Sequence, residues 1–152
     1  MFKKILVAID GSDQSKKALQ YALVLSEKFS SELIILTVYH KRLLPKISSE
    51  DVEAEEINLE LQEKYWESIK GYYTNILKSA EQIAKRAWPS VKYIALLAEG
   101  RVSTEIISAA QRNEVDLIVL GSRGMGGVTG WILGSTSKSV VDHSTRPVFI
   151  VK

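Results

Sequence analysis

Cysteine is absent from the 152 residues, and no apolar run approaches the roughly 20 residues that cross a membrane. The missing cysteine excludes disulfide scaffolds, thiol catalysis, zinc–thiolate centres and iron–sulfur clusters. A short apolar run, Ile5–Ile9, follows two lysines near the start, but it is too short for the apolar core of a secretory signal. We therefore expect a soluble protein of the cytoplasm.

An excess of charge of one sign is also absent. Twenty basic residues against eighteen acidic ones leave a net charge of +2, and no cluster of basic residues or basic–aromatic stripe occurs. A dedicated nucleic-acid-binding domain usually carries such a patch, so we expect no nucleic acid partner and no membrane partner. The length and the hydrophobic fraction of 45% suit a globular chain, and we predict one domain over residues 1–152.

Five short runs rich in aliphatic and β-branched residues are predicted to be strands. They are apolar throughout rather than alternating, which is typical of a parallel sheet that is covered on both faces. The predicted strands are Lys4–Ile9, Leu33–Tyr39, Val91–Ala98, Asp116–Leu120 and Pro147–Val151. Helical patterns separate them at Ser15–Ser30, from about Glu53 to Ala87, at Val102–Arg112 and at Thr136–His143. This alternation predicts an α/β fold with right-handed crossovers and helices on both faces of an open sheet.

The helical patterns also predict which residues are buried. We expect Ser12 or Asp13 to cap the first helix, Gly71 to be a point where the long helix could break, and Pro89 to end it. The first helix places Leu19, Ala22, Leu23 and Phe29 near one face, and the long helix has apolar positions at Ile57, Leu61, Ile69, Ile76, Leu77 and Ile83. Residues His40–Glu56 are predicted to be an exposed connection, whose acidic run Glu50–Glu56 is a solvated face rather than a metal site.

The strand Asp116–Leu120 leads into the most glycine-rich part of the chain. Five of the nine glycines fall within residues 121–130, and Gly134 adds a sixth. Glycine allows a ligand to approach the backbone N–H groups closely. Ser135, Thr136 and Ser137 then open a helix, whose unpaired N–H groups and dipole favour a phosphate. We therefore expect a phosphate site here rather than a plain exposed loop.

Neither of the two familiar phosphate motifs fits this segment. The Walker A loop needs a lysine where Gly127 stands, and the dinucleotide motif needs a third glycine where Thr129 stands. The sequence therefore argues against a P-loop nucleotidase and against a nicotinamide-dependent dehydrogenase.

The spacing Gly121-x2-Gly124-x9-Gly134-Ser135 resembles the nucleotide-binding signature of the universal stress protein family, in its ATP-binding branch. The resemblance covers the whole chain, including Lys3–Ser12, Ala98–Gly100, Val115–Gly124 and Arg146–Val151. It implies a Rossmann-like fold, similar to the adenine nucleotide α-hydrolases, with five parallel strands in the order 3-2-1-4-5. The first and fourth strands would then be neighbours where the winding reverses, so Asp10 and Gly121 would meet in one crevice.

The resemblance implies ATP, or ADP or AMP, as the ligand, with Mg²⁺ or Mn²⁺ as a companion. Asp10 would accept hydrogen bonds from the ribose or help to hold the metal through the phosphates. The backbone of Val38 would bind adenine beside Ala8 and Leu120. The phosphates would lie against Gly121, Arg123, Gly124, Gly134, Ser135, Thr136 and Ser137. We expect Trp131 and Ile132 to pack the loop, and we predict no catalytic role for His40 or His143.

The last strand is apolar at Val148–Val151 and would lie at the edge of the sheet, where it invites pairing. The resemblance implies that this strand makes a homodimer, and that the protein is a nucleotide-dependent regulator in a stress response. Two alternatives stay open: a slow ATPase or phosphotransferase that uses the same pocket, and a dimeric interaction module that binds no nucleotide. The chain lacks an obvious catalytic base or nucleophile, so the sequence favours binding over catalysis.

Overall fold

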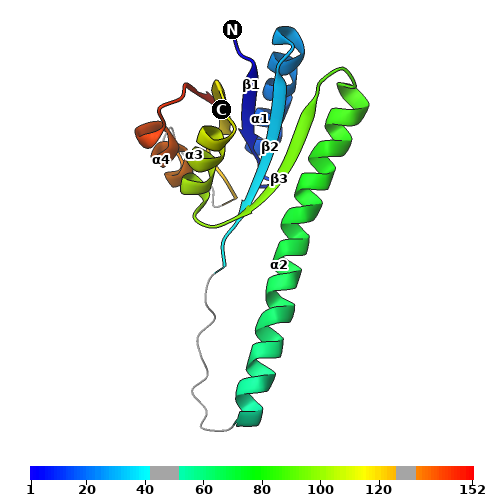
Figure 1. Cartoon of the computed structure of the whole chain (residues 1–152), viewed down its shortest axis with the longest axis vertical. Helices are drawn as coiled ribbons and strands as arrows, with labels where there is room; N and C mark the ends of the chain where they lie inside the picture. Colours follow the sequence, from blue (N-terminus) through cyan, green and yellow to red (C-terminus); the bar gives the residue numbers. More distant parts are fainter. Residues whose placement is uncertain (42–51, 126–132) are drawn as a thin grey trace.

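One five-stranded parallel sheet forms the centre of the molecule, in the order β3-β2-β1-β4-β5 (Figure 1). The computed structural model describes residues 1–41, 52–125 and 133–152. Within them the strands are β1 (Lys4–Ala8), β2 (Glu32–Tyr39), β3 (Tyr93–Glu99), β4 (Leu117–Gly121) and β5 (Val148–Val151). The helices are α1 (Asp13–Phe29), α2 (Val52–Ala87), α3 (Val102–Arg112) and α4 (Ser135–His143). The predicted α/β fold and strand order are confirmed, with strand ends shifted by one or two residues.

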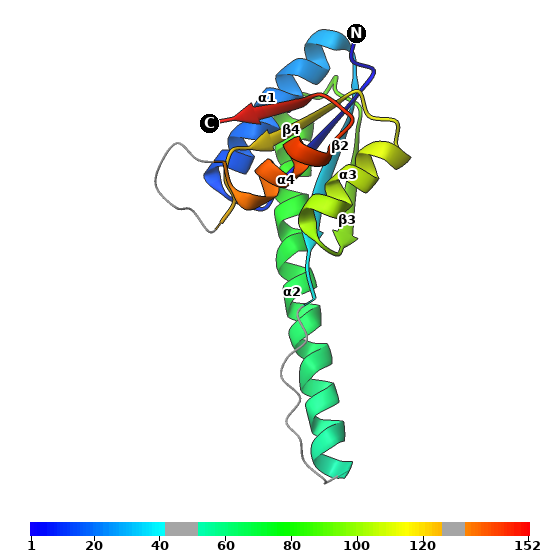
Figure 2. The same ribbon diagram turned by 90° about the vertical axis from the view of Figure 1, so that its left-hand side faces the viewer.

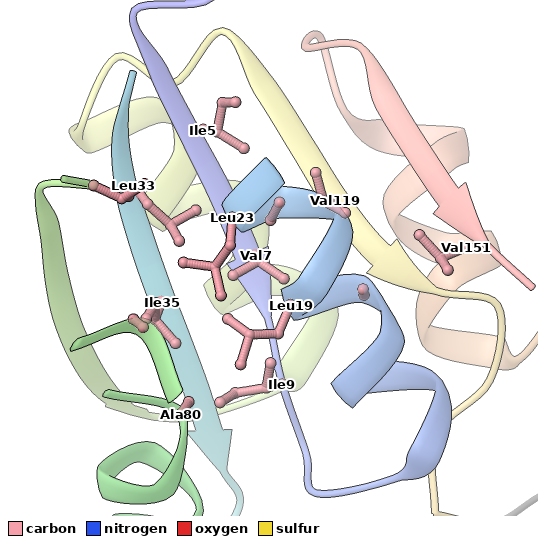
Figure 3. Close-up of a cluster of buried hydrophobic side chains, with 14 of the residues drawn as sticks. Ile5, Val7, Ile9, Leu19, Leu23, Leu33, Ile35, Ala80, Val119 and Val151 are labelled. Atoms are coloured by element: carbon pink, nitrogen blue, oxygen red, sulfur yellow. The ribbon is translucent and has the colours of Figure 1, made fainter. Parts of the chain in front are cut away.

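The helices cover the sheet in two layers, with α1 and α2 on one face and α3 and α4 on the other (Figures 1 and 2). Alternate residues of a strand point to opposite faces, so Ile5 and Val7 pack under α1 while Leu6 packs under α3 and α4. Figure 3 shows the cluster on the first face, where Leu19 and Leu23 of α1 lie over β1. Both faces are buried, which explains why the strands are apolar throughout.

Helix α1 starts at a capped turn and ends in a left-handed residue. The Oγ of Ser12 accepts a hydrogen bond from the backbone N–H of Ser15 at 3.1 Å, so Ser12 is the N-cap and the helix begins two residues before the predicted start. Leu19, Ala22 and Leu23 are buried as predicted. Phe29, expected near the same face, remains 39% exposed and packs edge-on against Phe2 at the border of the core.

Helix α2 is continuous over 36 residues, so Gly71 does not break it. Its last turns pack on the sheet through Leu77, Ala80 and Ala84. Its first half extends past the carboxyl ends of the strands and has no sheet beneath it (Figures 1 and 2). This geometry explains why Leu61, expected to be an apolar packing position, is 61% exposed.

Other expectations for α2 also need correction. Ile83 is 41% exposed, because the face that meets the sheet is made by Ala80 and Ala84. The connection predicted over His40–Glu56 is helical from Val52 onward. The structure does not describe residues 42–51, the side chains of residues 52–57, or Trp131 and Ile132. The predictions for the acidic run Glu50–Glu56 and for these two loop residues therefore fall outside the described part of the chain. No helix in the described part of the chain is long and apolar enough to span a membrane.

Candidate functional site

A cavity of about 660 Å³ opens at the carboxyl ends of the central strands. It lies at the junction of β1 and β4, where the chain connections diverge to opposite sides, as expected for an open α/β sheet. The eleven residues predicted from the sequence all line it: Ala8, Asp10, Val38, Leu120, Gly121, Arg123, Gly124, Gly134, Ser135, Thr136 and Ser137. Its volume is typical of a site for a small molecule.

Several lining residues were not predicted as part of the site. They are Ile9, Ser15, Tyr73, Val102, Ile106, Met125 and Leu133. Val102 and Ile106 belong to the apolar face of α3, and sequence periodicity alone cannot separate a core position from a cavity wall. Tyr73 precedes Ile76 and Leu77 by one helical turn, so it continues the α2 face that packs on the sheet. That spacing identifies the face on which Tyr73 lies, but it does not show that Tyr73 meets the cavity rather than the core.

Asp10 joins the end of β1 to the loop that follows β4. Its Oδ1 accepts a hydrogen bond from the backbone N–H of Ser12 at 2.9 Å, and its Oδ2 accepts one from the N–H of Met125 at 3.1 Å. The second bond links residues 115 positions apart. A carboxylate can accept about four hydrogen bonds, so both oxygens retain capacity for a ligand.

At two glycines in the loop, an added Cβ would come too close to another part of the protein. A Cβ on Gly121 would lie 2.9 Å from the backbone carbon of Gln14, at the start of α1. A Cβ on Gly124 would lie 2.6 Å from Oδ2 of Asp10. At Gly121 the clash is with backbone and excludes a larger residue before any ligand is considered, whereas at Gly124 the Asp10 side chain would have to shift.

Gly134 differs from these two, because a Cβ there would meet only ordinary contacts. The nearest atoms are the Cα of Arg123 and the carbonyl oxygen of Ser122, both at 3.4 Å. Its φ of −61° and ψ of 156° are open to any residue. The fold therefore does not by itself require glycine at this position.

The start of α4 presents backbone donors to the cavity. Gly134 is the N-cap and supplies no side-chain cap, so the first N–H groups of the helix have no intrahelical partner. The Oγ of Ser137 donates to the carbonyl of Gly121 at 2.8 Å, which fixes the helix start against the end of β4. Since the hydroxyl proton of Ser137 is used there, its backbone N–H is the donor that remains for a ligand. An anion is favoured at this helix end.

A group of tyrosines borders the cavity on the α2 side. The Tyr73 ring stacks against Tyr39 of β2, with centroids 6.2 Å apart and planes at 28°. Burial raises the pKa of Tyr73 above its usual value, and the nearby Tyr72 and the negative charge of Asp10 raise it further. The phenol is therefore protonated at neutral pH and can donate a hydrogen bond.

The two histidines lie away from this cavity. His143 Nδ1 is 2.8 Å from the carbonyl oxygen of Ser139 in its own helix, and His40 is exposed after β2. Within the described residues, no group of three or more His, Asp or Glu side chains is arranged to hold a metal ion. Asp10 is the one carboxylate among the described residues that line the cavity.

Comparison with known proteins gives a consistent result over the full length. The model of the universal stress protein family matches residues 1–152. The chain is 37% identical to the universal stress protein YxiE of Bacillus subtilis over 152 residues, which covers 100% of both. It is 29% identical to the universal stress protein MJ0577 of Methanocaldococcus jannaschii over 161 residues, which covers 100% of this chain and 96% of the relative.

Solved structures agree with this result. The structure of MJ0577 has a TM-score of 0.72 at 30% identity and covers 100% of this chain and 96% of its own. A universal stress protein solved in complex with cAMP has a TM-score of 0.70 at 27% identity and covers 99% of this chain and 97% of its own. The fold seen here therefore occurs in a relative that holds an adenine nucleotide.

Proposed function

Because the chain belongs to the universal stress protein family, we propose that it is a regulatory protein of the ATP-binding branch, formed by one nucleotide-binding domain over residues 1–152. Its ligand is ATP, or else ADP or AMP. One observation carries the proposal: the eleven residues chosen from the sequence line a single cavity at the switch point of the sheet. The relative solved with cAMP supports an adenine nucleotide as the ligand class.

The chemistry of the lining divides the cavity into three parts. Ala8, Val38 and Leu120 provide an apolar wall for the base. Asp10 suits the sugar, because a carboxylate accepts hydrogen bonds from hydroxyl groups and repels phosphate. The third part of the cavity is polar and is lined by the N–H donors of α4, the glycine loop and the guanidinium of Arg123.

The phosphates in this proposal lie between Gly124 and the start of α4. The helix dipole and the unpaired N–H groups stabilise negative charge there. A divalent cation such as Mg²⁺ or Mn²⁺ would reach the site on the phosphates, with Asp10 as the protein's nearest carboxylate in the described lining.

The residues that line the cavity favour nucleotide binding over nucleotide hydrolysis. Among its described residues Asp10 is the one acidic group and Arg123 the one basic group. Both Asp10 oxygens already accept backbone hydrogen bonds, so this carboxylate is engaged in holding the loop. We therefore propose that nucleotide occupancy, rather than turnover, is the signal.

We also propose that the protein acts as a homodimer through β5. This strand lies at the edge of the sheet, where its outer backbone groups can pair with a second copy. Phe149 is 38% exposed on this strand and packs edge-on against Tyr21 of α1, which is 51% exposed. The two rings make an apolar border along the edge that a second copy would cover.

The nucleotide proposal is tested on the purified protein. The protein is denatured and any released nucleotide is identified by chromatography, and the native protein is titrated with ATP and Mg²⁺ or Mn²⁺ while phosphate release is followed. Binding without sustained phosphate release supports the proposal. Sustained release would favour the ATPase instead, and no binding of any adenine nucleotide would refute the central claim.

A further inference from the structure

Tyr73 reaches the cavity from a helix that is not part of the glycine signature. It lies on the α2 face that also carries Leu77, Ala80 and Ala84, all of them buried against the sheet. One turn before Leu77, Tyr73 stacks on Tyr39, the last residue of β2, and its side chain lines the cavity. The packed turns that follow anchor Tyr73, so its position is defined by the fold.

The Tyr73 ring is held on two sides. It stacks on Tyr39, whose own hydroxyl donates to Oε2 of Glu99 at 3.0 Å. Tyr72 contacts it edge-on, with centroids 5.3 Å apart. The phenol hydroxyl of Tyr73, in contrast with that of Tyr39, has no hydrogen-bond partner among the described residues. A positioned phenol without a hydrogen-bond partner among the described residues is therefore present at the cavity.

The group that such a donor could meet follows from its neighbour. Asp10 lies in the same cavity and close enough for its charge to raise the pKa of Tyr73. A carboxylate repels phosphate and accepts hydrogen bonds from hydroxyl groups, and a phenol both donates and accepts. A sugar hydroxyl can therefore donate to Asp10 while it accepts from Tyr73.

We propose that Tyr73 is a specificity-determining residue of this cavity, which binds a sugar hydroxyl of the nucleotide together with Asp10. The inference rests on the nucleotide-binding function proposed above and adds a preference for ribonucleotides over deoxyribonucleotides. It places one recognition residue outside the glycine signature, on α2.

The test compares three nucleotides and two matched variants. Isothermal titration calorimetry measures the Kd of ATP, 2′-deoxy-ATP and 3′-deoxy-ATP for the wild type, Tyr73→Phe and Tyr72→Phe. Tyr72 is the control, because it is the adjacent phenol but does not line the cavity. Tyr73→Phe keeps the ring and its stacking, so thermal unfolding without nucleotide should match the wild type.

The wild type should bind ATP more tightly than at least one deoxy analogue. Tyr73→Phe should weaken ATP binding by about twofold to tenfold, the effect of one hydrogen bond, and leave the affinity for that analogue unchanged. Tyr72→Phe should behave as the wild type. Equal affinities of Tyr73→Phe and wild type for ATP, or equal losses for all three nucleotides, would overturn the sugar contact.

The result also separates this inference from the one on which it rests. A wild type that binds ATP and both deoxy analogues equally would refute the role of Tyr73 while nucleotide binding stands. A wild type that binds none of them would refute the proposed function, and the role of Tyr73 with it.

Discussion

Substitutions at Gly134 and Gly121 distinguish a glycine that ligand binding would require from a glycine that the fold requires. A methyl group on Gly134 would lie 3.4 Å from the Cα of Arg123 and 3.9 Å from the backbone nitrogen of Gly124. The protein accommodates it, but the methyl occupies space between the helix start and the loop, where the phosphates are proposed to lie. We expect Gly134→Ala to fold normally and to bind ATP poorly.

The expected size of each effect follows from these contacts. Crowding a filled site by one methyl group costs about 1–3 kcal/mol, which corresponds to a Kd about fivefold to 150-fold higher for Gly134→Ala. Alanine is a poorer N-cap than glycine, so the free energy of unfolding should fall by about 1 kcal/mol. Gly121→Ala reverses the pattern, because its Cβ would lie 2.9 Å from backbone that cannot rotate away. It should lose about 1–3 kcal/mol of stability with no nucleotide present.

The two variants are compared by thermal unfolding without nucleotide and by titration with ATP. Gly134→Ala should unfold within about 3 °C of the wild type, and Gly121→Ala should lose several degrees. A Gly134→Ala variant with the Kd of the wild type would show that no ligand approaches this glycine. A Gly121→Ala variant with unchanged Tm would show that the contact between β4 and α1 is looser than described.

Three further changes should alter stability or assembly. Gly71→Ala should raise the free energy of unfolding by about 0.5–1 kcal/mol, because Gly71 lies inside α2 and a Cβ there meets nothing within 4 Å; an unchanged or lower Tm would contradict this. The backbone N–H groups of Lys4 and Lys3 donate hydrogen bonds to the Asp116 carboxylate and lower its pKa. The ionised carboxylate therefore stabilises the fold. This stability is fully present above the unfolded pKa of about 3.9 and is lost as the pH falls through the lower folded pKa. Asp116→Asn should therefore be less stable than the wild type at pH 7, and acid titration should bring the two together; a constant difference down to the lowest pH would refute the assignment. Phe149→Glu should convert a dimer to a monomer in light scattering, whereas Phe29→Glu, at a phenylalanine of similar exposure away from β5, should leave the mass unchanged.

The strands themselves could be predicted from short-range patterns, whereas their order, and with it the position of the cavity, was implied by the resemblance to the universal stress protein family. Runs such as Ile5–Ile9 and Leu117–Leu120 indicate buried parallel strands, and the polar residue or glycine after each run marks a carboxyl end. Once the first and fourth strands are neighbours, Asp10 and Gly121 must meet, whatever the rest of the chain does.

What could not be predicted depends on contacts between distant segments. The bond from Met125 to Asp10 and the contact of Gly121 with Gln14 join positions more than 100 residues apart, and no local pattern encodes them. Phe29 has the periodicity of a core residue, but it lies at the last position of α1 and packs on Phe2 instead.

The same limit applies to α2. Its periodicity continues without a break from the exposed turns into the packed ones, so the sequence does not show where the sheet stops. Tyr73 lies where α2 passes the end of the sheet, and nothing in the sequence distinguishes it from the other positions of the helix.

The length of α2 beyond the sheet bears on how the helix could move about Tyr73. At 1.5 Å per residue, a 36-residue helix is about 54 Å long, and roughly half of it stands clear of the sheet. If α2 tilted as a rigid body about its packed end, the displacement would grow along its length. A tilt of about 5° at Tyr73 displaces the axis near Asn58 by roughly 2 Å. A ligand that tilted α2 at Tyr73 would therefore displace the exposed turns of the helix about 20 Å from the cavity.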